Sequence, residues 1–319
     1  SCQDPRWPAL AAGRAEASPE SGFMKIVYRL AVPAWLLGCA VAQNGAIDLL
    51  VGETLFAGGT RLSASWLQER AEVDQPEAGD LERRDMLVMG VMHSLRRGTD
   101  ATLLLPFVRV QGAATDGMTT LVGDDIEVGD LSLTLRQRVH HQTWQRGAWA
   151  TSLLGGLQLP TGNDDAREDG VLMPPGLQAG SGSVDPHFAV ASTLEFDRLR
   201  FDGSAFWSLP GEGSQNYQQG DLVSVALTAG YRVLMNQYPG PTLSLKTGLR
   251  WRSQDRATLD GAVVEESGGE ILSLQLIASY HPAPQWDMVA TLELPLTEDL
   301  HNPRIETDYR LLVGVGWRF

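Results

Sequence analysis

The chain ends in the stretch Tyr309-Arg310-Leu311-Leu312-Val313-Gly314-Val315-Gly316-Trp317-Arg318-Phe319, in which two kinds of side chain alternate. Large apolar side chains share one parity: Tyr309, Leu311, Val313, Val315, Trp317 and Phe319. The other parity holds Arg310, Gly314, Gly316 and Arg318. Successive side chains of a β-strand point to opposite faces, so this stretch predicts a strand with one apolar and one polar face.

The same pattern recurs along most of the chain. From about residue 60 onward, about twelve alternating stretches are separated by breaks rich in Gly, Pro, Asn or Asp. They lie near 60–70, 85–96, 99–111, 127–142, 147–159, 184–197, 199–209, 220–234, 241–254, 269–281, 285–297 and 305–319. No apolar run of about 18 residues follows the first fifty positions, which argues against membrane-spanning helices. The pattern predicts an all-β fold, a transmembrane antiparallel up-and-down β-barrel of about twelve strands.

The breaks alternate in length. Those after the even strands are short, as at Arg97-Gly98-Thr99 and Arg198-Leu199, whereas 71–84, 160–183 and 256–268 are long and acidic. Outer-membrane barrels have short periplasmic turns and longer extracellular loops. The alternation therefore predicts a barrel in the bacterial outer membrane. Both ends of the barrel chain are predicted to lie on its periplasmic side.

The alternation also assigns a face to each side chain. In the fourth stretch, a slip of one residue would move Arg136 and Arg138 into lipid at about 2–4 kcal/mol each. The inward parity is basic, although the whole chain has a net charge of −14. The predicted lumen-lining residues are Arg136, Arg138, Arg232, Lys246, Arg250, Arg252, Glu293, Arg310 and Arg318, with Glu195, Asp202 and Asp287 as further acidic partners. Two interpretations stay open: a path that attracts anions, or an ion-paired network that fills a narrow barrel.

Outward aromatic side chains are predicted in two bands. The periplasmic band holds Trp149, Phe201, Tyr231, Tyr280, Trp286 and Trp317, and the extracellular band holds Trp66, Trp207, Trp251 and Tyr309. Amphipathic rings prefer both membrane interfaces, whereas a soluble β-sandwich would not produce two bands. The bands also predict contact with outer-membrane lipid.

The N-terminal part has the pattern of a targeting segment. Residues 24–42 carry a basic start, an apolar core and small residues at Ala40 and Ala42, as expected for a Sec signal peptide that exports the chain. Residues 1–23 are then an upstream extension from a mis-assigned start, with a genuine N-terminal extension as the alternative, while 43–59 form an N-terminal segment and 60–319 the barrel. Cys39 offers the alternative of a lipidated N-terminus. Residues 43–59 could be a plug, a lead into the first strand or a periplasmic tail.

Two resemblances refine this picture. The terminal Gly314, Trp317 and Phe319 resemble the C-terminal signal read by the barrel assembly machinery, although Leu312 departs from it. The motifs 129–131 (Gly-Asp-Leu), 155–163 (GGLQLPTGN) and 180–186 (GSGSVDP) resemble the outer-membrane transporter family named for the MetA pathway of phenol degradation. This resemblance runs from about residue 125 to the end. It implies passage of small solutes, aromatic or hydrophobic ones among them, and supplies no catalytic residues.

Two irregular segments carry further predictions. In the third stretch the apolar parity gives way to Arg109 after Pro106, which predicts a bulge or an early strand end. In the loop 160–183, the apolar segment Val171, Leu172, Met173, Pro174 and Pro175 is a candidate gate at the extracellular mouth. The alternative is a loop that only packs against its neighbours.

The pattern favours a channel with no chemical step. His140 and His141 are adjacent in a predicted strand and cannot chelate together, so no metal site or cofactor is predicted. No basic cluster with interleaved aromatic residues indicates nucleic acid. The alternatives are a plugged structural barrel, serving as a sheath or adhesin, and a membrane-embedded lipid hydrolase. A hydrolase would need a Ser-His pair, and His141, the outward candidate, has no serine two positions away.

Overall fold

The computed structural model describes residues 51–73, 81–115, 118–121, 126–168, 171–237, 239–302 and 305–319. The predicted extension 1–23, the signal peptide 24–42, Cys39 and residues 43–50 lie outside the described residues.

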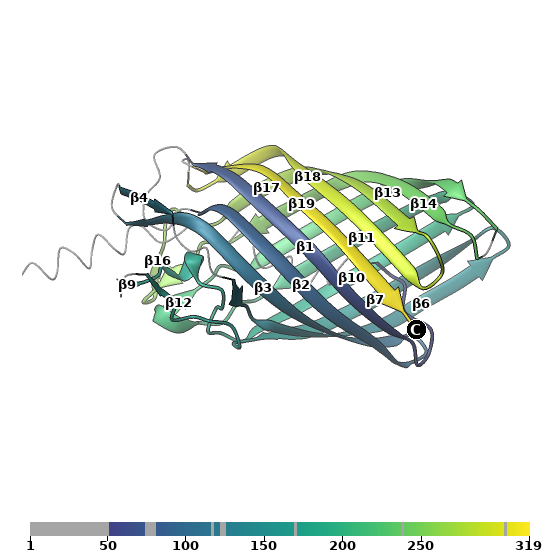
Figure 1. Cartoon of the computed structure of the whole chain (residues 1–319), viewed down its shortest axis with the longest axis horizontal. Coiled ribbons are helices and arrows are strands. Elements are labelled where there is room, and N and C mark those ends of the chain that lie inside the picture. The colour runs from purple at the N-terminus through teal and green to yellow at the C-terminus, as the bar shows by residue number, and fades with distance from the viewer. Residues whose placement is uncertain are drawn as a thin grey trace, which may run out of the picture.

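The described chain forms a closed antiparallel β-barrel of 12 strands, as predicted (Figure 1). The strands are β1 (Thr60–Val73), β2 (Leu81–Arg96), β3 (Thr99–Thr115), β6 (Leu131–Trp144), β7 (Gly147–Leu159), β10 (Asp185–Phe196), β11 (Leu199–Ser208), β13 (Leu222–Met235), β14 (Thr242–Gln254), β17 (Gly269–His281), β18 (Trp286–Leu300) and β19 (Ile305–Arg318). Each pairs with the next along the chain. Local hairpins of this kind follow directly from the alternating pattern and the turn residues between stretches.

The last strand closes the barrel. β19 pairs with β1 from Arg61↔Arg318 to Val73↔Ile305. At the end of this seam Thr60 and Phe319 exchange both backbone hydrogen bonds, each at 2.9 Å. Closure removes the open sheet edges, whose unpaired backbone groups could not be satisfied in lipid.

Short turns gather at one end of the barrel, the short-turn end, where the C-terminus also lies (Figure 1). Gly98 closes the β2–β3 turn with φ +84° and Asp197 closes the β10–β11 turn with φ +51°. Positive φ at these positions is what a tight hairpin requires. The small elements belong to the opposite, long-loop end: β4 (Met118–Leu121), β5 (Glu127–Val128), β8 (Arg167–Glu168), β9 (Val171–Leu172), η2 (Pro175–Leu177), η3 (Ser214–Asn216), β12 (Tyr217–Gln218), β15 (Thr258–Leu259) and β16 (Ala262–Val263).

The expected irregularity at Pro106 occurs, but in the neighbouring strand. β3 continues to Thr115, so the predicted early end is wrong. Its register with the partner changes by one residue between Leu104↔Ser132 and Phe107↔Val128. Gly129 donates its N–H to the Pro106 carbonyl at 2.9 Å, so the ring nitrogen of Pro106, which has no hydrogen, faces the same neighbour. The ladder therefore breaks here, and the stretch predicted as 127–142 becomes β5 and β6.

A second bulge corrects the predicted orientation of a histidine. In β6 the register shifts between Arg138↔Ser152 and His140↔Thr151, which leaves Val139 as the extra residue. His141 therefore pairs with Ala150, a residue of the inward parity, and His140 moves to the outer face. There the His140 ring packs on Trp149, with centroids 4.6 Å apart. The prediction of an outward His141 was wrong because a bulge inverts the parity that follows it.

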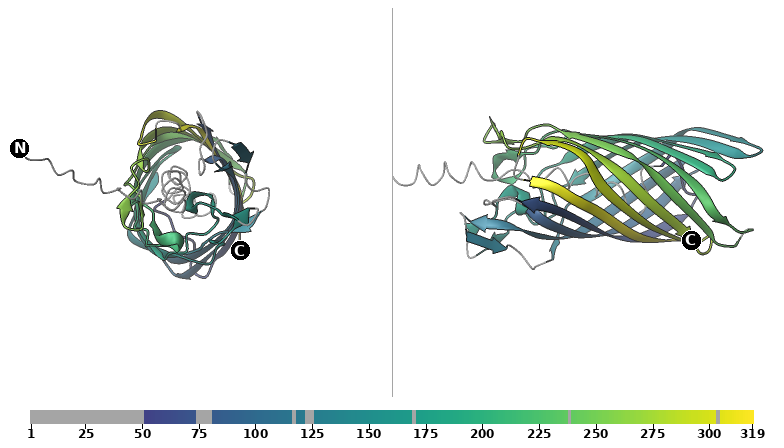
Figure 2. Two further views of the ribbon diagram at one scale, coloured as in Figure 1. Left: turned by 90° about the vertical axis from the view of Figure 1, so that its left-hand side faces the viewer. Right: turned by 90° about the horizontal axis from the view of Figure 1, so that it is seen from above.

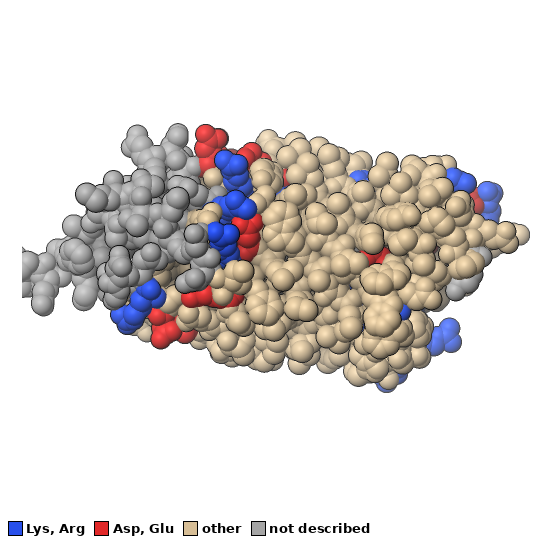
Figure 3. Space-filling view, in the orientation of Figure 1, with Lys and Arg blue, Asp and Glu red and all other residues tan. Residues whose placement is uncertain are grey.

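The outer surface is an apolar belt between two charged ends. Figure 3 shows a broad zone nearly free of charged side chains, with Lys, Arg, Asp and Glu toward both ends. Nine of the ten outward aromatic residues named above, all but Tyr309, are at least 36% exposed on this surface: Trp66, Trp149, Phe201, Trp207, Tyr231, Trp251, Tyr280, Trp286 and Trp317. Among the described residues no helix is long and apolar enough to cross a membrane.

Candidate functional site: the barrel interior

A buried cluster of charges joins five strands near mid-barrel. Arg250 contacts Glu293 at 2.6 Å, and Arg310 contacts Glu69 at 3.0 Å and Glu293 at 3.5 Å. Gln275 donates to Glu293 at 2.7 Å. Each of these residues is 5% exposed or less. Since buried charges are costly unless paired, this cluster, the mid-barrel cluster, crosslinks β1, β14, β17, β18 and β19 from inside.

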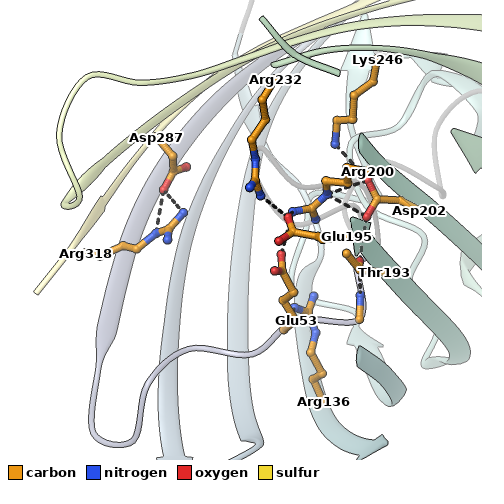
Figure 4. Close-up of polar contacts among 11 residues, drawn as sticks. Glu53, Arg136, Thr193, Glu195, Arg200, Asp202, Arg232, Lys246, Asp287 and Arg318 are labelled. Carbon is orange, nitrogen blue, oxygen red and sulfur yellow. Dashed lines mark hydrogen bonds and ion pairs between the residues drawn. The ribbon is translucent and has the colours of Figure 1, made fainter. Parts of the chain in front are cut away.

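A second cluster lies near the short-turn end and is centred on Arg200 (Figure 4). Arg200 contacts Glu53 at 2.9 Å, Glu195 at 3.1 Å and Asp202 at 3.0 Å. Two further cations share these carboxylates: Arg232 pairs with Glu195, and Lys246 contacts Asp202 at 3.1 Å. Nearby, Asp287 is shared by Arg61 at 2.6 Å and Arg318 at 3.0 Å.

The predicted lumen-lining residues separate into two groups by burial. Arg136, Arg250, Arg252, Glu293 and Arg310 are buried, whereas Arg138, Arg232, Lys246 and Arg318 are half-buried. All of them except Arg136, Arg138 and Arg252 take part in the ion pairs described above. Arg136 donates to the Glu53 carbonyl at 2.8 Å, and Arg138 lies beside the turn at Gly98.

Sequence reasoning missed several members of these clusters. Arg61 and Glu69 of β1 and Arg200 of β11 are absent from the predicted set, although each lies on the buried parity of its strand. Strict alternation could have found them. Glu53 precedes the first strand and has no parity signal of its own.

A cavity of about 530 Å³ opens at the short-turn end. Its walls carry Arg61, Arg136, Arg200, Arg232, Lys246 and Arg318, together with Glu53 and Glu195. Between these charges lie apolar side chains, among them Leu55, Met92, Met235, Ile277 and Val289. The cavity is therefore amphipathic.

The segment before β1 lies inside the barrel. Gly52 donates its N–H to the Thr193 hydroxyl at 3.1 Å and accepts a hydrogen bond from Ser152 at 2.7 Å. Leu55 donates its N–H to Asp100 at 3.0 Å. These partners come from β3, β7 and β10, so residues 52–55 of segment 43–59 run along the inner wall. Whether segment 43–59 acts as a plug, a lead into the first strand or a periplasmic tail stays a prediction.

The predicted gate segment folds inward at the long-loop end. Met173 and Leu177 are each 5% exposed and pack against inward apolar residues of the first three strands. These residues are Leu67, Met86, Val88, Leu104, Val108 and Val110. Val171 and Leu172 form β9, and Pro174 leads through Pro175 into η2. The end-on view of Figure 2 shows the teal chain of this loop within the ring of strands.

The glycine-rich motifs meet around the carboxylate of Asp130. It accepts hydrogen bonds from the Gly162 N–H at 2.8 Å, from Gln158 at 3.2 Å, and from both the N–H and the hydroxyl of Ser181 at 2.7 Å. The backbone of Gly162 lies against those of Gly129 and Gly180: a Cβ on Gly162 would be 2.8 Å from Gly129 and 2.7 Å from Gly180. Three segments far apart in sequence are thereby joined, and we call this group the loop anchor.

The terminal residues have visible structural roles. Trp317 stacks beside Phe319 at 4.6 Å and faces Trp286 at 6.3 Å between ring centroids. Gly314 is buried on the opposite face of β19, and a Cβ on Gly316 would lie 2.6 Å from Asp287. Recognition of Gly314, Trp317 and Phe319 by the assembly machinery stays a prediction.

Among the described residues, no three His, Cys, Asp or Glu side chains are grouped so as to hold a metal ion. His140, which the bulge places on the outer face, packs on a tryptophan ring. The interior offers charged and apolar walls for binding and passage.

Comparison with solved structures relates the fold to outer-membrane proteins. The COG4313 outer membrane channel from Pseudomonas putida F1 matches with a TM-score of 0.63 and 20% identity, covering 86% of this chain and 100% of that chain. The β domain of the Bordetella autotransporter BrkA matches with a TM-score of 0.47 and 13% identity, covering 82% and 100%. The KdgM porin matches with a TM-score of 0.41 and 9% identity, covering 81% and 99%. At these identities the first match shows the fold alone.

Comparison with curated proteins finds no match. A family model described as "Putative MetA-pathway of phenol degradation" matches residues 96–294, which is more than half of the chain. This range contains the loop anchor and eight of the twelve barrel strands from end to end. The chain belongs to this MetA-pathway phenol-degradation family.

Proposed function

We propose that the protein is an outer-membrane channel for passive transport of small molecules, aromatic or hydrophobic solutes among them. The observation that carries this proposal is the interior: a closed barrel with charged and apolar walls and a cavity of about 530 Å³ at the short-turn end. Such an interior suits binding and release of a small solute rather than a chemical step. Family membership supports the same class of solute.

We place the short-turn end in the periplasm and the long-loop end outside, as in other outer-membrane barrels. In this orientation the inward loop stands at the extracellular mouth, and residues 51–59 stand on the periplasmic side. Passage of a solute then requires both segments to give way. Export by a signal peptide and insertion by the assembly machinery belong to the same proposal.

Conductance of the purified protein in planar lipid bilayers tests the channel. We expect current steps in KCl, and a larger open fraction after deletion of residues 171–177. Swelling of protein-loaded liposomes in arabinose measures passage of an uncharged solute. Well-folded barrels that stay silent in both measurements would contradict the proposal.

A plugged structural barrel is the second candidate. It is favoured by the two inward segments and by the paired charges of the mid-barrel cluster, which all lie inside the barrel. This candidate predicts no conductance from the intact protein and none after deletion of residues 171–177. We favour the channel because a cavity of about 530 Å³ stays open at the short-turn end although the loop with residues 171–177 and the segment before β1 both enter the barrel. We do not propose the remaining alternative, a membrane-embedded lipid hydrolase.

A further inference from the structure

The cavity at the short-turn end, which the proposed channel function leaves without an assigned occupant, has an imbalance of charge. Six cationic side chains line it: Arg61, Arg136, Arg200, Arg232, Lys246 and Arg318. Of the residues that the structure describes, only Glu53 and Glu195 line it with negative charge. Two more carboxylates, Asp202 and Asp287, pair with these cations from the wall. Among the described residues the cavity thus has six positive and four negative charges.

The imbalance arises because carboxylates are shared. Asp287 serves both Arg61 and Arg318, and Glu195 serves both Arg200 and Arg232. Asp100 interacts electrostatically with both Arg136 and Arg138, and with Asp100 and Arg138 included the described residues carry seven positive and five negative charges, so the difference stays at two.

Two of the arginines that share a carboxylate, Arg232 and Arg318, keep part of their surface open to the cavity. Arg318 is 33% exposed and Arg232 is 26% exposed in their side chains, whereas Arg61, the other partner of Asp287, is 3% exposed. A guanidinium presents several N–H donors in one plane, so an arginine paired to one carboxylate can still donate to another. Figure 4 shows Arg318 with Asp287 and Arg232 with Glu195.

The rest of the wall combines apolar side chains with the polar residues Thr54, Asn236, Thr242, Ser244, Ser279 and His281. Leu55, Met92, Met235, Ile277 and Val289 stand among the charges and can contact a ring or a short alkyl chain. A volume of about 530 Å³ is within the usual range for sites that enclose a small organic molecule. Surplus positive charge beside apolar surface selects a ligand with a carboxylate on an apolar body.

We propose that this cavity binds small amphipathic organic anions, such as aromatic carboxylates, with Arg232 and Arg318 as the carboxylate-binding side chains. This inference rests on the proposed channel and names its preferred solute class. The sequence left two alternatives, a path that attracts anions and an ion-paired network. In this proposal both occur in one interior, at different depths. The mid-barrel cluster is buried and paired, and the short-turn cavity has surplus cations.

Binding to the full-length purified protein in nanodiscs tests the site. Benzoate, benzyl alcohol and benzylamine have the same ring with a negative, neutral or positive side group. By isothermal titration we expect benzoate to bind and the other two to bind at least about tenfold more weakly, since charge-assisted hydrogen bonds are stronger than neutral ones.

The variant R232Q/R318Q removes the surplus and leaves no carboxylate unpaired, because Arg200 still pairs with Glu195 and Arg61 with Asp287. We expect its benzoate affinity to fall roughly tenfold or more. The matched control R97Q/R146Q removes two exposed arginines from turns at the same end of the barrel, outside the cavity. We expect the control to bind benzoate as the unmodified protein does.

Equal binding of benzoate and benzylamine, or undiminished benzoate binding by R232Q/R318Q, would overturn the assignment. Conductance in KCl is measured on the same preparations. Benzoate binding without conductance would contradict the channel and keep the site. Conductance with no preference for benzoate would contradict the site and keep the channel.

Discussion

The carboxylate of Asp130, at the bulge between β5 and β6, accepts two hydrogen bonds from Ser181, one from its backbone N–H and one from its hydroxyl, both at 2.7 Å. Ser181 lies at the end of the loop that enters the barrel. One buried side chain therefore ties the barrel wall to the loop.

Replacing Asp130 with Asn should release this loop. An amide cannot supply two anionic oxygens, and each lost hydrogen bond to a charged group removes about 1.5–3 kcal/mol from the attachment. We expect faster cleavage within residues 160–183 by an added protease, with the barrel intact. Asp165→Asn is the control, because Asp165 is exposed in the same loop. Equal cleavage of the two variants would show that Asp130 does not hold the loop.

Replacing Glu293 with Gln should destabilise the whole barrel. Glu293 pairs with both Arg250 and Arg310, and removal of one partner from a buried ion pair costs about 3–5 kcal/mol. Urea unfolding in lipid vesicles, followed by tryptophan fluorescence, measures the loss. Asp308→Asn breaks the exposed pair with Arg70, for which we expect less than about 1 kcal/mol. If Glu293→Gln lowers the free energy of unfolding by no more than Asp308→Asn does, the mid-barrel cluster does not stabilise the barrel.

Replacing Gly316 with Ala should disturb the closing seam. The added Cβ would lie 2.6 Å from Asp287 and 2.7 Å from the Arg61 guanidinium, while pairing with β1 and β18 fixes the backbone. Overpacking of this kind costs about 1–3 kcal/mol. Urea unfolding in lipid vesicles, followed by tryptophan fluorescence, measures this loss of stability as well. At Gly155 the nearest atom to an added Cβ is 3.7 Å away, so Gly155→Ala is a control expected to cost little.

Replacing Gly52 with Val should displace residues 51–56 from the inner wall. A Cβ at this position would lie 2.2 Å from the Ala150 carbonyl oxygen, closer than any real contact. Because the segment reduces the open cross-section, we expect a higher open probability in planar bilayers. Phe56→Ala, which alters a residue that is 61% exposed, should leave the conductance unchanged. A Gly52 variant with unaltered gating would show that this segment does not limit passage.

The strands were predictable from sequence because alternation is a local property. Stretches such as 147–159 and 269–281 match β7 and β17 to the residue, and the inward parity placed Glu195, Asp202, Asp287 and Glu293 beside basic partners. Where a local irregularity interrupts the ladder, this reasoning fails. The bulge at Val139 inverts the faces of the residues after it, and no composition signal marks its position.

Sequence alone thus determined the barrel class, the strand positions to within about four residues and, between bulges, which side chains point inward. Only the tertiary structure decided which inward charges meet, such as Arg310 with Glu69 or Arg61 with Asp287, and that two segments enter the lumen. The physical reason is that a β-strand's faces follow from its own period of two residues, whereas the contents of a barrel depend on closure. Closure brings together residues from the two ends of the chain, and no local pattern encodes their distance.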